Sequence, residues 1–184
     1  LRCGLIGSEE AAISKAAPLV DIVIHYQVGS QQVILNGENV TGLIRTEEVG
    51  NMASASSVYP AVRAHLLDLQ RNLAASTNVI MDGRDIGTCI LPDADTKIFL
   101  TASTHIRALR RYKELTAKGI MCNLQEIEQD IEERDQRDMT RSIAPLKQAE
   151  DAVLIDGSGM TIEEVIEAII TVAVAHGLEV TSGM

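Results

Sequence analysis

The sequence predicts an α/β fold in which a parallel core sheet flanked by helices is joined to a small antiparallel sheet. From residue 60 onward, short apolar runs alternate with longer segments of helical spacing, which is typical of parallel strands connected by helices. Before that point, the connections between apolar runs are too short for parallel crossovers. Apolar residues make up 46% of the chain and aromatic residues only 2%, so the expected core consists of Ile, Val, Leu, Ala and Met.

The first part of the chain is expected to form one helix and the antiparallel sheet. A helix is predicted over residues 8–17 with Ser8 as its N-cap. Asn36 and Gly37 are a turn signal between strands. The strands themselves are predicted at residues 19–25, 31–35 and 40–44. Residues 45–57 are polar and serine-rich, and we expect mainly a loop with short helical turns.

The second part should contain the parallel sheet and its helices. Pro60 suits the first position of a helix, and the leucines after it have helical spacing. Strands are predicted at residues 79–81, 97–100 and 152–155. Helices are predicted to end at Lys118, before Gly119, and to span residues 124–140 and 161–176.

Charge and cysteine content exclude several classes of protein. The net charge is −10, which argues against binding DNA or RNA polymers. Residues 61–120 nevertheless carry nine cations and six anions, and eleven of the sixteen cations in the chain are arginines, the residue suited to bidentate phosphate recognition. A small anionic ligand fits this pattern, although a solvated surface also fits. Three widely spaced cysteines without a CxxC motif fit a reducing cytoplasm, and no apolar run is long enough to cross a membrane.

The first candidate site is the segment Asp82–Asp85, which follows an apolar run. Ligands of open α/β sheets lie beyond the carboxyl ends of strands. Gly83 allows close approach of the backbone, Arg84 can form a fork with a phosphate, and Asp85 can accept a hydrogen bond from an amino or hydroxyl group. The alternative is a polar turn with an internal Asp–Arg pair.

The second candidate lies on the predicted helix 124–140. Arg134, Asp138 and Arg141 have the spacing i, i+4, i+7, which places them on one helical face. Two guanidiniums can then hold a phosphate while the carboxylate between them accepts from a ribose hydroxyl. The commoner explanation of such a segment is a surface helix with internal ion pairs.

A third group is Arg107, Arg110 and Arg111, on the helix after residues 97–100. These arginines can close over a polyphosphate as a lid, and a solvated face is an equally good interpretation. The four histidines are scattered, so the sequence supports neither a metal site nor a Ser/His/Asp site.

Together these segments resemble the bacterial-type cytidylate kinases, nucleoside monophosphate kinases that phosphorylate CMP and dCMP with ATP. The most specific motifs are DGRDIGT and ERDxRDxxRxxAPL, and the matching stretches cover nearly the whole chain in the family's order. The longer of these stretches are LNGENVTGLIRTEEVGNMAS, MDGRDIGTCILPDADTKIFLTAS, IEERDQRDMTRSIAPL and AVLIDGSGMTIEEVIE. The resemblance implies a P-loop NTPase-like fold with a small antiparallel CMP-binding insertion at residues 18–57, and a core domain formed by residues 1–17 and 58–184 with a lid around 105–142.

The resemblance also implies roles for individual residues. The cytosine-reading positions are Ser54, Arg63 and Asp85. Arg84 and Arg141 match arginines that bind the CMP phosphate, and Arg134 and Asp138 match the surroundings of the ribose and phosphate. Arg110 and Arg111 lie in the implied lid, so that Arg84, Arg110, Arg111 and Arg141 are the implied catalytic residues. ATP is implied to contact Arg110, Arg111, Gly157 and Ser158, with Mg²⁺ as the cofactor of ATP.

One feature of the family is not found in the sequence. No glycine is followed by lysine, so the 184 residues contain no GxxxxGK[ST] segment. In P-loop enzymes this segment holds the ATP phosphates and a Mg²⁺ ligand. The expectation is therefore that the first strand and P-loop are absent from this chain, which would be an N-terminally truncated form, inactive by itself.

The expected protein is a cytoplasmic enzyme, monomeric when intact, with CMP, dCMP and ATP as its ligands and with no nucleic-acid polymer or membrane as a partner. Strand-mediated association is expected if an interior strand is missing. Two alternatives remain open: a module that binds a nucleoside monophosphate without transferring phosphate, and another small-molecule kinase of the same fold.

Overall fold

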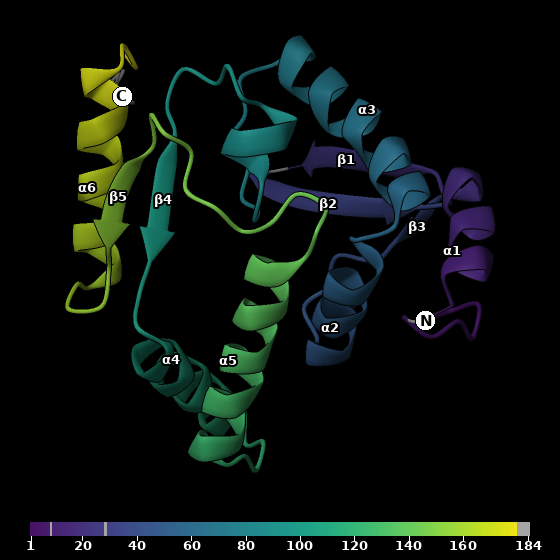
Figure 1. Ribbon diagram of the computed structural model, residues 1–184. Helices are drawn as coiled ribbons and strands as arrows, with labels where there is room; N and C mark the ends of the chain where they lie inside the picture. The colour runs from purple at the N-terminus through teal and green to yellow at the C-terminus, as the bar shows by residue number, and fades with distance from the viewer. Residues whose placement is uncertain (8, 28, 180–184) are drawn as a thin grey trace. The chain divides into compact units, whose positions relative to one another are not determined.

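The computed structural model describes residues 1–7, 9–27 and 29–179, and these form two compact units, residues 1–80 and 81–184 (Figure 1). The predicted N-cap Ser8 lies outside the described residues. The predicted domain organisation is a different one, in which residues 18–57 form a CMP-binding insertion into a core domain of residues 1–17 and 58–184. It stays a prediction.

The described residues of the first unit form three α-helices, one 3-10 helix and an antiparallel sheet. Its elements are α1 (Glu10–Ala16), η1 (Ala17–Leu19, a 3-10 helix), β1 (Ile22–Gln27), β2 (Ser30–Leu35), β3 (Glu38–Asn39), α2 (Glu47–Ser56) and α3 (Pro60–Ser76). The strand order is β1–β2–β3, and both pairings are antiparallel. This confirms the expected small antiparallel sheet.

The turn between β2 and β3 was predicted correctly, but the third strand was placed too late. Asn36 and Gly37 both have positive φ, 49° and 82°, as a two-residue hairpin turn requires. The strand after the turn is β3, and residues 41–45 form a turn. The side chains of Thr41 and Asn39 explain this difference. Thr41 Oγ1 accepts from the backbone N–H of Val33 at 2.9 Å, and Asn39 Oδ1 accepts from Thr41 N–H at 3.0 Å, so side chains replace ladder bonds here.

The predicted loop at residues 45–57 is wrong, because most of it is helix α2. The Thr46 hydroxyl accepts from the backbone N–H of Val49 and caps the helix, and Glu47 and Glu48 lie in the first turn, where the helix dipole stabilises anions. The next helix, α3, begins at Pro60 as expected.

The described residues of the second unit form a parallel pair of strands, three α-helices and one π-helix. Its elements are η2 (Ile86–Ile90, a π-helix), β4 (Ile98–Thr101), α4 (Thr104–Ala117), α5 (Leu124–Thr140), β5 (Val153–Asp156) and α6 (Ile162–Ala175). Strands β4 and β5 pair in parallel, with Ile98 opposite Val153. The chain between them forms the helical pair α4–α5, and α6 packs on β5 (Figure 1). The parallel pairing of β4 with β5 and all three helices confirm the prediction for this part of the chain.

The helices of the second unit begin and end where their capping residues indicate. Ser103 and Asn123 cap α4 and α5 through their side chains. Thr161 and Glu164 form a reciprocal capping box at the start of α6. Gly119 has a φ of 72°, a conformation that favours glycine, and it follows the end of α4.

The predicted strand at residues 79–81 is wrong. These residues adopt no strand, and the side chain of Ile80 is fully exposed. The apolar sequence favours a strand, but a strand also needs a partner with which to form hydrogen bonds. Among the described residues, the ladder partner of β4 is β5.

The buried apolar side chains come from isoleucine, valine and alanine. Ile13 and Val40 are buried in the first unit. Those of the second unit are Ile90, Ala102, Ala108 and Ile155. No helix among the described residues is both long and apolar enough to cross a membrane.

Candidate functional site

The π-helix η2 holds the backbone of Asp85 at the start of the site. The carbonyl oxygen of Asp85 accepts from the backbone N–H of Cys89 at 2.9 Å and of Ile90 at 3.3 Å. The hydroxyl of Thr88 donates to the same oxygen at 3.4 Å. Single π-turns are frequent at functional sites. The sequence analysis did not identify this element.

Gly83 allows a close approach, but to a neighbouring side chain. A Cβ atom at this position would lie 2.8 Å from Cγ1 and 2.9 Å from Cδ1 of Ile86. Glycine therefore lets the turn fold onto η2. A role of Gly83 toward a ligand stays a prediction.

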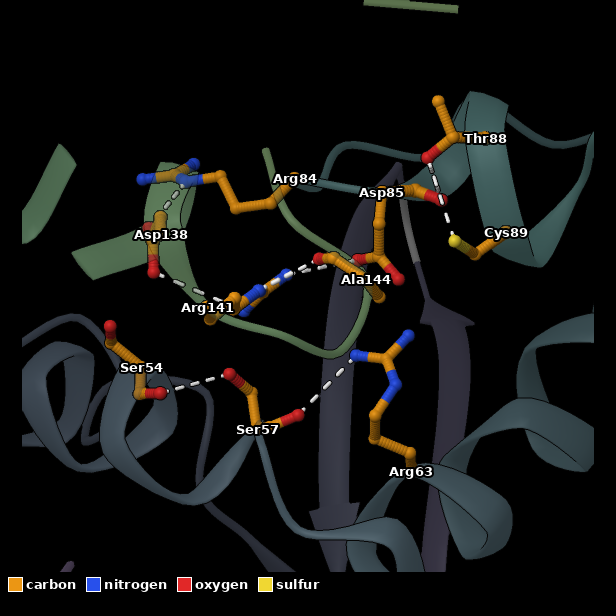
Figure 2. A network of polar contacts seen from close by, with 10 residues as sticks. All are labelled: Ser54, Ser57, Arg63, Arg84, Asp85, Thr88, Cys89, Asp138, Arg141 and Ala144. Atoms are coloured by element: carbon orange, nitrogen blue, oxygen red, sulfur yellow. Dashed lines mark hydrogen bonds and ion pairs between the residues drawn. The ribbon is translucent and has the colours of Figure 1, made fainter. Parts of the chain in front are cut away.

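Helix α5 carries Arg134 and Asp138, and Asp138 forms an ion pair with Arg84. Arg84 Nε donates to Asp138 Oδ2 at 3.0 Å, as Figure 2 shows. The Asp138 side chain is 3% exposed, whereas the Arg84 side chain is 38% exposed. A bound ligand can therefore reach the Arg84 guanidinium while Asp138 holds it from the buried side.

Arg141 lies just beyond the end of α5 and joins the same cluster (Figure 2). It is the C-cap residue with extended backbone angles, so the predicted single helical face holds for Arg134 and Asp138 only. Its Nη2 lies 3.6 Å from Asp85 Oδ1, and its Nη1 lies 3.9 Å from Asp138 Oδ1. The structure thus brings together Arg84, Asp85, Asp138 and Arg141, from two motifs far apart in the sequence.

The loop after α5 orients Arg141 and was not identified from the sequence. Arg141 Nε donates to the carbonyl oxygen of Ala144 at 2.7 Å. Ala144 has a φ of 47°, the left-handed region that a non-glycine residue seldom occupies, and Pro145 follows it. The backbone N–H of Leu146 donates to the carbonyl of Asp138 at 2.7 Å and holds the loop against α5.

Arg134 contributes a buried donor to the site. Its Nε is buried and has no hydrogen-bond partner among the described residues. Burial lowers the pKa of the Arg134 guanidinium, and the nearby Arg84 charge lowers it further, while the Asp138 carboxylate opposes the change. A buried donor without an acceptor costs about 1–3 kcal/mol, so a ligand that supplied an acceptor would be stabilised here.

The charges of this cluster favour an anionic ligand. Three guanidiniums, those of Arg84, Arg134 and Arg141, lie near two carboxylates, those of Asp85 and Asp138. One positive charge is in excess at this place, although the chain as a whole carries a charge of −10. We call these five residues the arginine–aspartate cluster.

In the first unit, Ser54 and Arg63 are both linked to Ser57 (Figure 2). The Ser57 hydroxyl donates to the carbonyl of Ser54 at 2.9 Å, and Arg63 Nη1 donates to the carbonyl of Ser57 at 3.4 Å. The turn between α2 and α3 therefore brings together two of the three residues expected to read cytosine. Their action together with Asp85 stays a prediction.

Arg110 donates hydrogen bonds to the loop after β5, whereas Arg111 pairs with a residue of its own helix. Arg110 Nη2 donates to the carbonyl oxygens of Gly157 and Met160, the latter at 3.1 Å. Arg111 forms an ion pair with Glu114 on its own helix at 2.9 Å. Their roles as lid residues stay predictions.

The loop after β5 is itself ordered by Asp156 and Ser158. The carboxylate of Asp156 accepts from the hydroxyl of Ser158 at 2.6 Å and from its backbone N–H at 2.9 Å. The bond from the Ser158 hydroxyl, followed by the bond from its backbone N–H, lowers the pKa of Asp156. Ser158 Oγ in turn accepts from the backbone N–H of Ser103, and the N–H of Gly157 donates to Thr101, so the loop is held against the end of β4.

The fold and the site define an α/β protein with a cluster of arginines and aspartates that has one positive charge in excess. A family model described as cytidylate kinase matches residues 6–175, and the chain belongs to the cytidylate kinase family. It is 51% identical to the cytidylate kinase of Alkaliphilus metalliredigens over 149 residues, which cover 81% of this chain and 68% of the relative. The expected family resemblance is confirmed.

Two further relatives match more of the chain. The cytidylate kinase of Aeromonas salmonicida is 46% identical over 170 residues, which cover 91% of this chain and 73% of the relative. The cytidylate kinase of Methylococcus capsulatus is 42% identical over 173 residues, which cover 94% of this chain and 78% of the relative. Each match therefore extends over both the antiparallel sheet and the arginine–aspartate cluster.

Proposed function

We propose that this chain acts as a nucleoside monophosphate kinase that converts CMP and dCMP to their diphosphates with ATP. The observation that carries the proposal is the arginine–aspartate cluster, in which Arg134 Nε is buried without an acceptor and one positive charge is in excess. A monophosphate supplies both the negative charge and the acceptor. Membership of the cytidylate kinase family supports the choice of cytidine as the nucleoside.

Arg84, Arg134 and Arg141 are the proposed phosphate ligands. The Arg84 side chain is 38% exposed, against 7% for Arg141, and its Nη atoms remain for the ligand while Nε is held by Asp138. The accepting oxygen of CMP is already anionic, so the reaction needs no strong general base. Positioning and charge neutralisation by arginine then lower the barrier to in-line transfer.

Asp85 is the proposed reader of the base, together with Ser54 and Arg63. Its carboxylate accepts hydrogen bonds and cannot donate when ionised, so it suits the exocyclic amine of cytosine and disfavours a uracil carbonyl. Arg141, 3.6 Å away, holds it from one side. Asp138 is the proposed partner of the ribose hydroxyls, next to Arg134.

On the ATP side we propose contacts from Arg110, Arg111, Gly157 and Ser158. The bonds from Arg110 to the Gly157–Met160 loop support this grouping for three of the four residues. Mg²⁺ is proposed to arrive with the ATP phosphates. Within the described residues, no group of three His, Cys, Asp or Glu side chains is placed to hold a metal ion.

These 184 residues contain no GxxxxGK[ST] segment, and the absence of the donor-phosphate cradle from them stays a prediction. The proposed contribution of the described residues is the acceptor half of the site and the loop after β5. Failure of the 184 residues alone to transfer phosphate stays a prediction, as do a monomeric intact enzyme and a cytoplasmic location.

The test measures ATP-dependent formation of nucleoside diphosphates by the intact enzyme with CMP, dCMP, UMP and AMP in parallel. The expected result is the highest kcat/KM with CMP and dCMP. Preference for another acceptor would overturn the proposal in favour of a different small-molecule kinase. Tight CMP binding by calorimetry without CDP formation would identify a binding module instead.

A further inference from the structure

We propose that Arg107 is a positioning residue: it ties the end of β4 and the start of α4 to Asp135 on α5, and thereby fixes Arg134 and Asp138 against Arg84. This inference rests on the proposed function, because it concerns the same acceptor site. It departs from the sequence analysis, in which Arg107 was a lid or solvated residue.

The contacts of Arg107 reach three parts of the second unit. Its Nε donates to the carbonyl oxygen of Ala102 at 2.9 Å, just after β4. Its Nη2 donates to Thr104 Oγ1 at 3.2 Å and to Asp135 Oδ2 at 2.5 Å. The first two bonds hold the guanidinium at the connection between β4 and α4, and the third joins it to α5.

Asp135 lies between the two cluster residues of α5. It directly follows Arg134 and precedes Asp138 by less than one helical turn, so a shift of α5 at Asp135 displaces both. The Asp135 carboxylate also counteracts part of the effect of burial on the pKa of Arg134. Asp135 therefore affects Arg134 in two ways, through its position on α5 and through its negative charge.

An ordinary surface ion pair would contribute little to stability, because water and salt screen its charges. This pair differs in its surroundings. The Asp135 side chain is 19% exposed and that of Arg107 is 34% exposed, and Arg107 is held by two further acceptors before it meets Asp135. A guanidinium fixed in this way loses little freedom on pairing.

The experiment compares Arg107→Gln, Asp135→Asn and the double variant of the intact enzyme in steady-state kinetics and in calorimetric CMP binding. We expect each single variant to raise the KM for CMP by about 5- to 30-fold, because charge-assisted bonds are lost on an element that carries two ligand contacts. The KM for ATP should stay within about twofold. The double variant should be no worse than the worse single variant, because both remove the same interaction.

Matched controls have the same charge changes on the same helices. Lys118→Gln removes a cation near the end of α4 that pairs with Glu114 on its own helix, and Asp130→Asn removes an exposed anion from α5. Neither should change the KM for CMP. Arg107→Lys, which keeps a cation near Asp135, should recover part of the loss.

Several outcomes would overturn the inference. They are an unchanged KM for CMP in both single variants, equal rises for CMP and ATP, additive effects in the double variant, or a lowered Tm without any change in CMP binding. If the wild-type enzyme bound CMP but did not transfer phosphate, calorimetric measurement of CMP binding by the variants would still test the positioning role of Arg107. If it bound no CMP at all, the proposed function and this inference would both fail.

Discussion

Arg84 Nε donates to Asp138 Oδ2 at 3.0 Å across 54 positions of the sequence, and this bond joins two motifs into one site. The carboxylate is 3% exposed, so it fixes the guanidinium from the protein side. A phosphate that bound Arg84 would meet a side chain already held in place. Preorganisation of this kind reduces the entropy lost on binding.

Replacing Arg84 with alanine should weaken CMP binding far more than cytidine binding. A charge-assisted hydrogen bond contributes about 1.5–3 kcal/mol, which corresponds to an increase of about 10- to 150-fold in the Kd for CMP. Cytidine has no phosphate, so its Kd should change little. Arg141→Ala should act in the same direction but also lower the Tm, since its 7% exposed side chain lies near two buried carboxylates.

Isothermal calorimetry with CMP and cytidine measures both effects. Arg71→Ala is the control, because Arg71 is an exposed arginine of α3 to which no role in the site is assigned. Equal losses for CMP and cytidine would refute the phosphate role of Arg84.

Replacing Asp85 with asparagine should narrow the preference for CMP over UMP. The amide can donate as well as accept, so it can pair with a uracil carbonyl that the carboxylate disfavours. We expect the ratio of kcat/KM for CMP to that for UMP to fall by about tenfold or more. Asp82→Asn, an exposed carboxylate in the same turn, should leave the ratio unchanged. An unchanged ratio in Asp85→Asn would show that the base is read elsewhere.

The local parts of the site could be predicted from the sequence, while its assembly could not. The spacing of Arg134 and Asp138 predicted one helical face, and the structure places both on α5. The approach of Arg141 to Asp85 depends on the loop after α5, whose left-handed Ala144 precedes a proline against the usual preference. Sequence spacing describes geometry within an element and does not describe a turn of this kind.

Errors in the fold have equally specific causes. The serine content of residues 45–57 favoured a loop, although Thr46 followed by Glu47 and Glu48 is a helix-start signal that predicts α2. Residues 79–81 are apolar enough for a strand, but apolar sequence alone does not supply a hydrogen-bond partner. The capped helices α4, α5 and α6 were predicted well because their signals are local.

Replacing Arg110 with alanine should affect ATP and spare CMP. Arg110 donates to the carbonyl oxygens of Gly157 and Met160, so its loss frees the loop that is proposed to contact ATP. We expect the KM for ATP to rise by about tenfold, with the KM for CMP within about twofold. Lys113→Ala, an exposed cation on the same helix, is the control. A rise in the KM for CMP alone would contradict the assignment.

The ion pair between Lys97 and Asp151 should make the stability of the fold depend on pH. Lys97 Nζ lies 2.5 Å from Asp151 Oδ2, and the Lys97 side chain is 10% exposed. This hydrogen-bonded ion pair holds the pKa of the Asp151 carboxyl below its usual value of 3.8. Because folding favours the ionised form, the stabilisation is complete above that usual value and is lost as the pH falls through the lower pKa of the folded state.

Asp151→Asn should therefore have a lower Tm than the wild type near neutral pH, and the difference should disappear in strong acid. Asp151 is 64% exposed, so the effect should be small and should shrink with added salt. Thermal unfolding from about pH 2 to about pH 7 measures it, with Asp95→Asn as an exposed control on the connection between η2 and β4. A difference that persisted in strong acid, or that grew as the pH fell, would mean that Asp151 stabilises the fold by something other than its charge.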